Sequence, residues 1–95
     1  MPSITADDRL RRASRVSWQD IDGETILLVL QQEKLIGLNR AAGRIWQLID
    51  GSRTNAEVAA LVAEDFDGPR ERILQDTLAF AQALTARGFA EVVSP

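Results

Sequence analysis

The side chains that most often do catalytic or metal chemistry are absent from this chain or stand in unsuitable patterns. It contains no His and no Cys, so it lacks the commonest general base, the commonest metal ligand and every thiolate. Glu64 and Asp65 are adjacent, and neighbouring residues of a helix point in different directions. No phosphate-binding loop, dinucleotide fingerprint or metal-ligand spacing occurs. These residue types predict a protein that is not an enzyme and that has no cofactor and no metal.

The chemistry that the sequence does offer is binding through apolar surface, and one stretch for it is Lys34–Leu38. This stretch is predicted to be a short strand that runs directly into a helix. Asn39 stands at the junction, where its side chain can accept from an early helical N–H group. Because nothing is assigned beside it on its far side, this strand is predicted to lie at the edge of a small sheet.

The second stretch is the predicted helix Pro69–Arg87, which is apolar over more of its circumference than one packing contact requires. Its apolar residues form two adjacent stripes, which are Ile73, Thr77, Phe80 and Leu84, and Leu74, Leu78 and Ala81. One interpretation is a helix buried between the sheet and other helices. The other is that part of this surface lines a groove for a partner.

The rest of the chain supplies the elements that position these two stretches. Asp22-Gly23 favours a tight turn, which predicts a hairpin of the strands Arg15–Ile21 and Glu24–Gln31 ahead of Lys34–Leu38. Further helices are predicted over Arg40–Asp50, ended by Gly51, and from a Thr54 cap to about Asp65. The predicted fold class is therefore α+β, a three-stranded antiparallel sheet followed by three helices, which is winged helix-turn-helix-like.

The N-terminal residues 1–14 show no sustained periodicity and are predicted to form a mobile arm, with any order confined to its end, and the folded domain is predicted over residues 15–95. Four Arg lie between residues 9 and 15, which suggests either a solvated terminus or a docking arm for an acidic partner. Residues 16–95 carry 7 basic and 12 acidic side chains, which disfavours binding to nucleic acid. The longest apolar run, Ile26–Leu30, is far too short to span a membrane, which predicts a cytoplasmic protein.

Several segments follow one another in a distinctive order and spacing, namely KLIGLN, AAGRIW, LIDG, TNAEVAALV and ARGF. This pattern, over about Val16–Val93, resembles the PqqD family, named for the pyrroloquinoline quinone biosynthesis protein D. The domain of this family is also called the RiPP recognition element, the module that binds the leader of ribosomally made precursor peptides. The resemblance implies that residues 15–95 are a PqqD-like peptide-binding domain, a monomer or weak homodimer.

The resemblance also implies a mechanism, in which a leader peptide adds as a strand beside Lys34–Leu38 and its side chains enter a groove next to the last helix. The expected peptide-binding residues are Lys34, Leu35, Ile36, Gly37, Leu38, Arg70, Leu74, Thr77, Leu78 and Ala81. We expect Ile36 and Leu38 to face the core and Leu35 the groove. Ile73, Phe80 and Leu84 are expected in the core. The backbone groups that point outward belong either to Lys34, Ile36 and Leu38 or to Leu35 and Gly37.

The predicted partner besides the leader is a maturation enzyme, either a leader peptidase, as in lasso-peptide pathways, or a radical SAM enzyme, as in quinone cofactor synthesis. Two other functions remain open from the sequence. A winged-helix DNA-binding regulator would need a basic reading helix, whereas the last helix mixes three Arg with Glu71 and Asp76. A plain protein-protein adaptor would use the same groove for a protein helix.

Overall fold

The structure, a computed structural model, describes residues 4–93. The elements in chain order are β1 (Arg9–Arg12), β2 (Ser17–Ile21), β3 (Glu24–Val29), the 3-10 turn η1 (Leu30–Gln32), β4 (Lys34–Leu38), α1 (Arg40–Leu48), β5 (Asp50–Thr54), α2 (Asn55–Asp65), α3 (Arg70–Ala86) and β6 (Ala90–Val92). They form two three-stranded antiparallel sheets and three helices, which confirms the α+β class. Within these residues, no helix combines the length and the apolar composition needed to cross a membrane.

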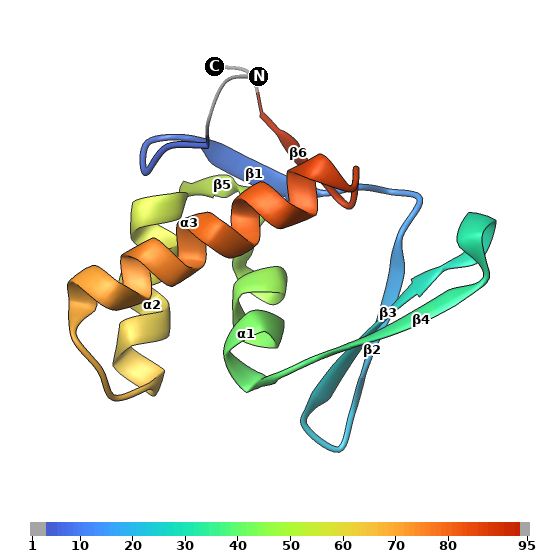
Figure 1. Ribbon diagram of the computed structural model, residues 1–95, viewed down its shortest axis with the longest axis horizontal. Helices are drawn as coiled ribbons and strands as arrows, with labels where there is room; N and C mark the ends of the chain where they lie inside the picture. The colour runs from blue at the N-terminus through green and yellow to red at the C-terminus, as the bar shows by residue number, and fades with distance from the viewer. Residues whose placement is uncertain (1–3, 94–95) are drawn as a thin grey trace.

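The sheet β2-β3-β4 is the meander that the sequence predicts. Its first turn is made by Asp22 and Gly23, whose φ angles of 52° and 84° are those of a two-residue hairpin turn. The helices lie to one side of this sheet, which projects beyond them at the right of Figure 1. The face toward the helices buries Leu27 and Val29, each 1% exposed. This sheet therefore has one packed face and one open face.

The prediction of a mobile arm over residues 1–14 is wrong for its second half. Arg9–Arg12 forms β1, the central strand of a second sheet with the order β5-β1-β6. Leu10 in this strand is fully buried, and Ala13 is 3% exposed. The physical reason is that β5 and β6 pair with β1, one on each side. Backbone hydrogen bonds to these two strands order a stretch that has no clear hydrophobic periodicity. Residues 1–3 lie outside the described part.

Arg side chains near the N-terminus contact other parts of this chain. Arg11 pairs with Glu91 at 3.0 Å. Arg12 donates to the carbonyls of Trp46 and Gln47 at 3.0 and 2.9 Å, which satisfies groups left unpaired at the end of α1. These contacts make a docking arm for an acidic partner the weaker interpretation of this segment.

The chain after α1 differs from the predicted helix that ends at Gly51. The helix stops at Leu48, and Asp50–Thr54 forms β5, which pairs with β1. Ile49 between them is 1% exposed and lies in the core. Tertiary packing therefore ends the helix before Gly51, the residue at which the sequence predicts its end. At the start of α1 the expected cap is confirmed, because Asn39 accepts from the Ala42 N–H group at 2.8 Å.

The start of α2 is the predicted capping box. The Thr54 side chain accepts from the Glu57 N–H group at 3.1 Å, and the Glu57 carboxylate accepts from the Thr54 N–H group at 2.9 Å. These bonds lower the pKa of Glu57 below its usual value of 4.5. The ionised carboxylate therefore favours the folded state, and this contribution is present above the unfolded pKa.

We expect that contribution to disappear as the pH falls from about 4.5 through the lower pKa of the folded state. Urea unfolding of the parent and of Glu57→Gln, measured at pH 7 and pH 3, tests this. The parent should lose more stability over this interval than the variant, because Gln cannot titrate. Equal losses in the two proteins would show that the capping box contributes nothing to the pH dependence.

Candidate functional site: the β4 edge and its groove

The outer edge of β4 carries backbone groups with no strand beside them in the part of the chain that the structure describes. Which groups point outward follows from the hairpin turn. A two-residue turn closes on a hydrogen-bonded pair, here Ile21 and Glu24. Such pairs alternate along the ladder, so Glu24 and every second residue after it bond to β2. The residues between them, Thr25, Leu27 and Val29, bond to β4.

The partners of these three residues on β4 are Leu38, Ile36 and Lys34. Their N–H and C=O groups are therefore used within the sheet. Leu35 and Gly37 lie between them, so their backbone groups point away from β3 toward solvent. This alternation resolves the question that the sequence leaves open, and it gives the outward set as Leu35 and Gly37.

A groove lies between β4 and the C-terminal half of α3, beside the open edge. It is a hollow of about 230 Å³, and the residues that line it are Leu27, Ile36, Leu38, Phe80, Ala83, Leu84, Arg87 and Phe89. All but one of these side chains are apolar, and Arg87 is exposed. An apolar hollow next to unpaired strand groups can take the side chains of an added strand, while the edge takes its backbone.

The structure places the predicted β4 residues at this site, but the side chain of Leu35 lies on the face opposite to the predicted one. Ile36 and Leu38 are half-buried and line the groove, as well as facing the core. Leu35 is 72% exposed and does not line it. Consecutive strand residues alternate between faces, so the side chain of Leu35 lies on the open face of the sheet. The expectation that Leu35 faces the groove is therefore wrong.

The α3 residues predicted for the groove lie elsewhere. Thr77 and Ala81 are each 1% exposed, so they belong to the core. Arg70 and Leu74 line a separate hollow of about 150 Å³ against the alanines of α2. Leu78 is half-buried and is absent from the groove lining. The groove is instead lined by Phe80, Ala83, Leu84 and Arg87. Leu84 is 4% exposed and lies in the core as predicted, whereas Phe80, also predicted for the core, is only half-buried.

Helix packing explains why Thr77 and Ala81 lie in the core while Phe80 lines the groove. Helix α3 packs against α2. Thr77 and Ala81 follow Arg70 and Leu74 at helical spacing, so they share the flank whose first turns line the hollow against α2. Phe80 lies on the flank toward the sheet, where it is half-buried and lines the groove. A signal for this was present in the sequence, because small residues spaced four apart on a helix favour a close helix contact.

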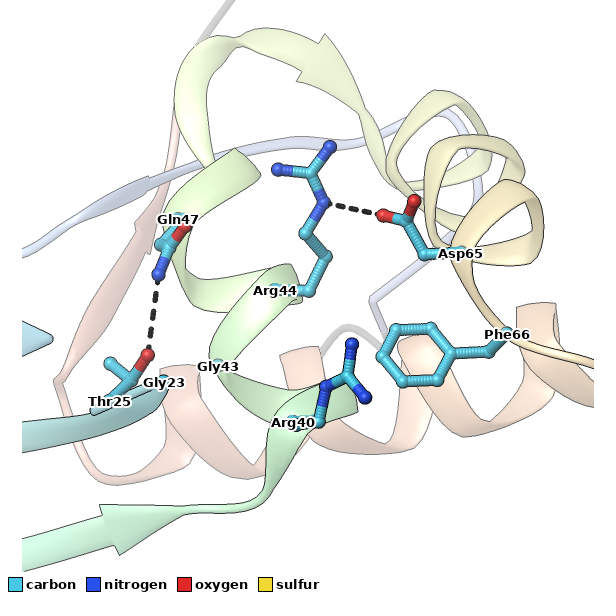
Figure 2. A pocket seen from close by; sticks show the side chains of 8 residues that line it. All are labelled: Gly23, Thr25, Arg40, Gly43, Arg44, Gln47, Asp65 and Phe66. Atoms are coloured by element: carbon cyan, nitrogen blue, oxygen red, sulfur yellow. Dashed lines mark hydrogen bonds and ion pairs between the residues drawn. The ribbon is translucent and has the colours of Figure 1, made fainter. Parts of the chain in front are cut away.

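A third, more polar hollow of about 400 Å³ lies among α1, the end of α2 and the β2-β3 turn. Figure 2 shows its side chains directed toward one another: Arg44 pairs with Asp65 at 2.9 Å, and Gln47 donates to Thr25 at 3.4 Å. The Arg40 guanidinium lies 5.7 Å from the centre of the Phe66 ring. Within residues 4–93, no group of His, Cys, Asp and Glu side chains could hold a metal ion. These polar groups already have partners, so the β4 groove is the better candidate.

Comparison with known proteins identifies the family to which this chain belongs. Residues 24–90 match the family described as coenzyme PQQ synthesis protein D (PqqD). The chain belongs to the PqqD family. A relative from Rhizobium meliloti, named PqqA binding protein, is 35% identical over 90% of this chain and 85% of its own length. The PqqA binding protein of Pseudomonas aeruginosa is 32% identical over 97% of both chains.

Solved structures confirm the PqqD-family fold over nearly the whole chain. TbiB1 in complex with the TbiA(beta) leader peptide is 25% identical, with a TM-score of 0.77 over 90% of this chain and 99% of TbiB1. The PqqD truncation of Methylobacterium extorquens PqqCD, described as a stand-alone RiPP recognition element, is 20% identical. Its TM-score is 0.76, over 94% of this chain and 95% of its own.

Proposed function

We propose that this chain is a non-catalytic recognition protein that binds the leader segment of a ribosomally made precursor peptide. The leader adds as a strand to β4, and the protein presents the bound precursor to a maturation enzyme, a leader peptidase or a radical SAM enzyme. The observation that carries the proposal is the position of β4 at the edge of its sheet, with no strand beside it among residues 4–93, next to an apolar groove. The relatives named for binding PqqA, and the neighbour bound to a leader peptide, support it.

The two parts of the site divide the work of recognition. The N–H and C=O groups of Leu35 and Gly37 can pair with any peptide backbone, so they supply affinity without selecting a sequence. Side chains of an added strand alternate between the two faces of the sheet. Every second residue of the leader therefore faces the groove of Ile36, Leu38 and Phe80, where apolar side chains are favoured.

The DNA-binding alternative is not favoured by the arrangement of α3. Its open flank toward the sheet carries Phe80, Ala83 and Leu84, whereas a helix that reads the major groove presents polar and basic side chains. The net charge of −3 also opposes binding to a phosphate backbone.

Selection of a random 14-residue peptide library by mRNA display on the immobilised protein tests the proposed function. The strongest binder, called here the selected peptide, is then labelled for fluorescence anisotropy, with synthetic PqqA of Rhizobium meliloti as a second probe. We expect saturable binding at physiological salt, no binding of duplex DNA, and an unchanged peptide mass after incubation. The proposal would be overturned if no peptide is enriched, or if the enriched peptides bind without needing the β4 edge.

Phe80 provides a test of which flank of α3 lines the site. Phe80→Ala should weaken binding of the selected peptide about tenfold, because a large apolar contact in the groove is lost. Since Phe80 is only half-buried, its stability loss should be below the roughly 3–5 kcal/mol of a fully buried Phe. Leu78→Ala on the other flank is the control and should leave affinity unchanged. If anisotropy shows that Leu78→Ala loses affinity and Phe80→Ala does not, the peptide contacts the flank of α3 that the sequence predicts.

A further inference from the structure

One end of the groove is basic, although the chain as a whole carries a net charge of −3. Arg87 follows the last turn of α3 and is the charged residue of the groove lining. Lys34 is the first residue of β4, and its side chain lies on the same face of the sheet as Ile36, which lines the groove. Both side chains are exposed.

Arg15 shows that these two cations lie at the same end. Its guanidinium donates to the Gln31 side chain at 3.4 Å and to the carbonyls of Arg87 and Gly88 at 3.3 and 2.9 Å. Gln31 belongs to the turn η1, which comes just before Lys34. Arg15 thus ties the tip of the β3-β4 hairpin to the C-terminal end of α3. Figure 1 shows the opposite end of β4 running into α1.

Within the part of the chain that the structure describes, neither Lys34 nor Arg87 forms an ion pair. Among residues 4–93 the ion pairs are Arg11–Glu91, Arg44–Asp65, Arg53–Asp50 and Arg72–Asp76. Glu33 is next to Lys34 in the chain, yet it forms no ion pair with either cation. An ion pair within the described residues therefore does not explain why Lys34 and Arg87 lie at the basic end of the groove.

We propose that Lys34 and Arg87 select a peptide with an acidic residue two positions from the apolar residue that enters the groove. The inference rests on the proposed function. In an added strand, the residue across from Ile36 points into the groove, and the next residue on the same face is two positions along, across from Lys34. A carboxylate there meets Lys34 from the strand and Arg87 from the helix, which gives charge-assisted hydrogen bonds. The ligand class is thus an acidic-apolar segment with one residue between the two positions.

The display selection described above tests this directly when it is repeated on two charge-reversed proteins. The first carries Lys34→Glu together with Arg87→Glu. The control carries Arg70→Glu, which reverses a charge at the other end of the same helix, next to α2. The parent and the control should enrich Asp or Glu two positions from an apolar residue. The doubly reversed protein should enrich Lys or Arg at that position.

Affinity measurements complete the test. Replacing the acidic residue of the selected peptide with its amide should weaken binding to the parent about threefold to tenfold and should strengthen binding to the doubly reversed protein. Circular dichroism confirms that each variant is folded before selection. Peptides that need the β4 edge but show no acidic preference would overturn this inference alone. Loss of the acidic preference in the Arg70→Glu protein would also overturn it, because the charge contact would then be made by Arg70. Absence of any edge-dependent peptide would instead overturn the proposed function.

Discussion

Replacing Leu35 with proline is expected to abolish most peptide binding while the protein stays folded. The Leu35 N–H group points away from β3, so proline removes no hydrogen bond of the sheet. It removes a donor that an added strand needs and leaves an acceptor on that strand unpaired, at a cost of roughly 1–3 kcal/mol. Affinity for the selected peptide should therefore fall roughly 10- to 100-fold. Fluorescence anisotropy measures the loss, and thermal melting confirms the fold.

The neighbouring positions provide matched controls. Leu35→Ala keeps the N–H group and changes only a side chain that is 72% exposed on the open face, so binding should be unchanged. Ile36→Pro removes a bond to Leu27 in the centre of the sheet and should unfold the protein or lower its melting temperature strongly. A folded Leu35→Pro protein that binds as tightly as the parent would mean that the peptide uses another surface.

The sequence was sufficient to predict β4 because each of its signals is local. The apolar run, the Asn39 cap and the Asp22-Gly23 turn each depend on a few neighbouring residues, and all three agree with the structure. The outward set of backbone groups depends on register instead. Register is fixed once the turn type and the pairs of β3 with both neighbours are known, which the sequence does not supply.

The groove residues of α3 could not be assigned from periodicity alone. Two adjacent apolar stripes are equivalent until it is known which neighbour each one meets. The structure gives Thr77 and Ala81 to the core and Phe80 to the groove. The choice therefore depends on the position of the sheet relative to the helices, which is a tertiary property.

The N-terminal segment was missed for a related reason. A four-residue strand with three charged side chains has little hydrophobic signal, and only Leu10 is fully buried in it. What stabilises it is pairing with β5 and β6, which come more than thirty residues later in the chain. Non-local pairing of this kind leaves no local trace, whereas the meander of β2, β3 and β4 is joined by short turns.

Deletion of β1 should consequently be the most damaging change to the fold, although the sequence predicts a mobile arm there. A chain that begins at Ala13 lacks the central strand of the second sheet, so β5 and β6 lose their partner. It also lacks Leu10 from the core and the Arg12 contacts to the end of α1. These losses together approach the roughly 5–15 kcal/mol by which a small domain is stable. We expect no cooperative unfolding transition at 25 °C.

Point substitutions make this prediction quantitative in a chain of full length. Leu10→Ala removes buried apolar volume from β1 and should lower the free energy of unfolding by about 2–5 kcal/mol. Arg9→Ala is the matched control in the same strand, since its side chain is exposed, and should change stability by about 0.5 kcal/mol or less. Urea denaturation followed by circular dichroism measures both. Because Leu10 lies in the second sheet, away from the groove lining, the Leu10→Ala protein should still bind the selected peptide wherever it remains folded. If Leu10→Ala unfolds at the same urea concentration as Arg9→Ala, β1 contributes nothing to the core and the segment is an arm after all.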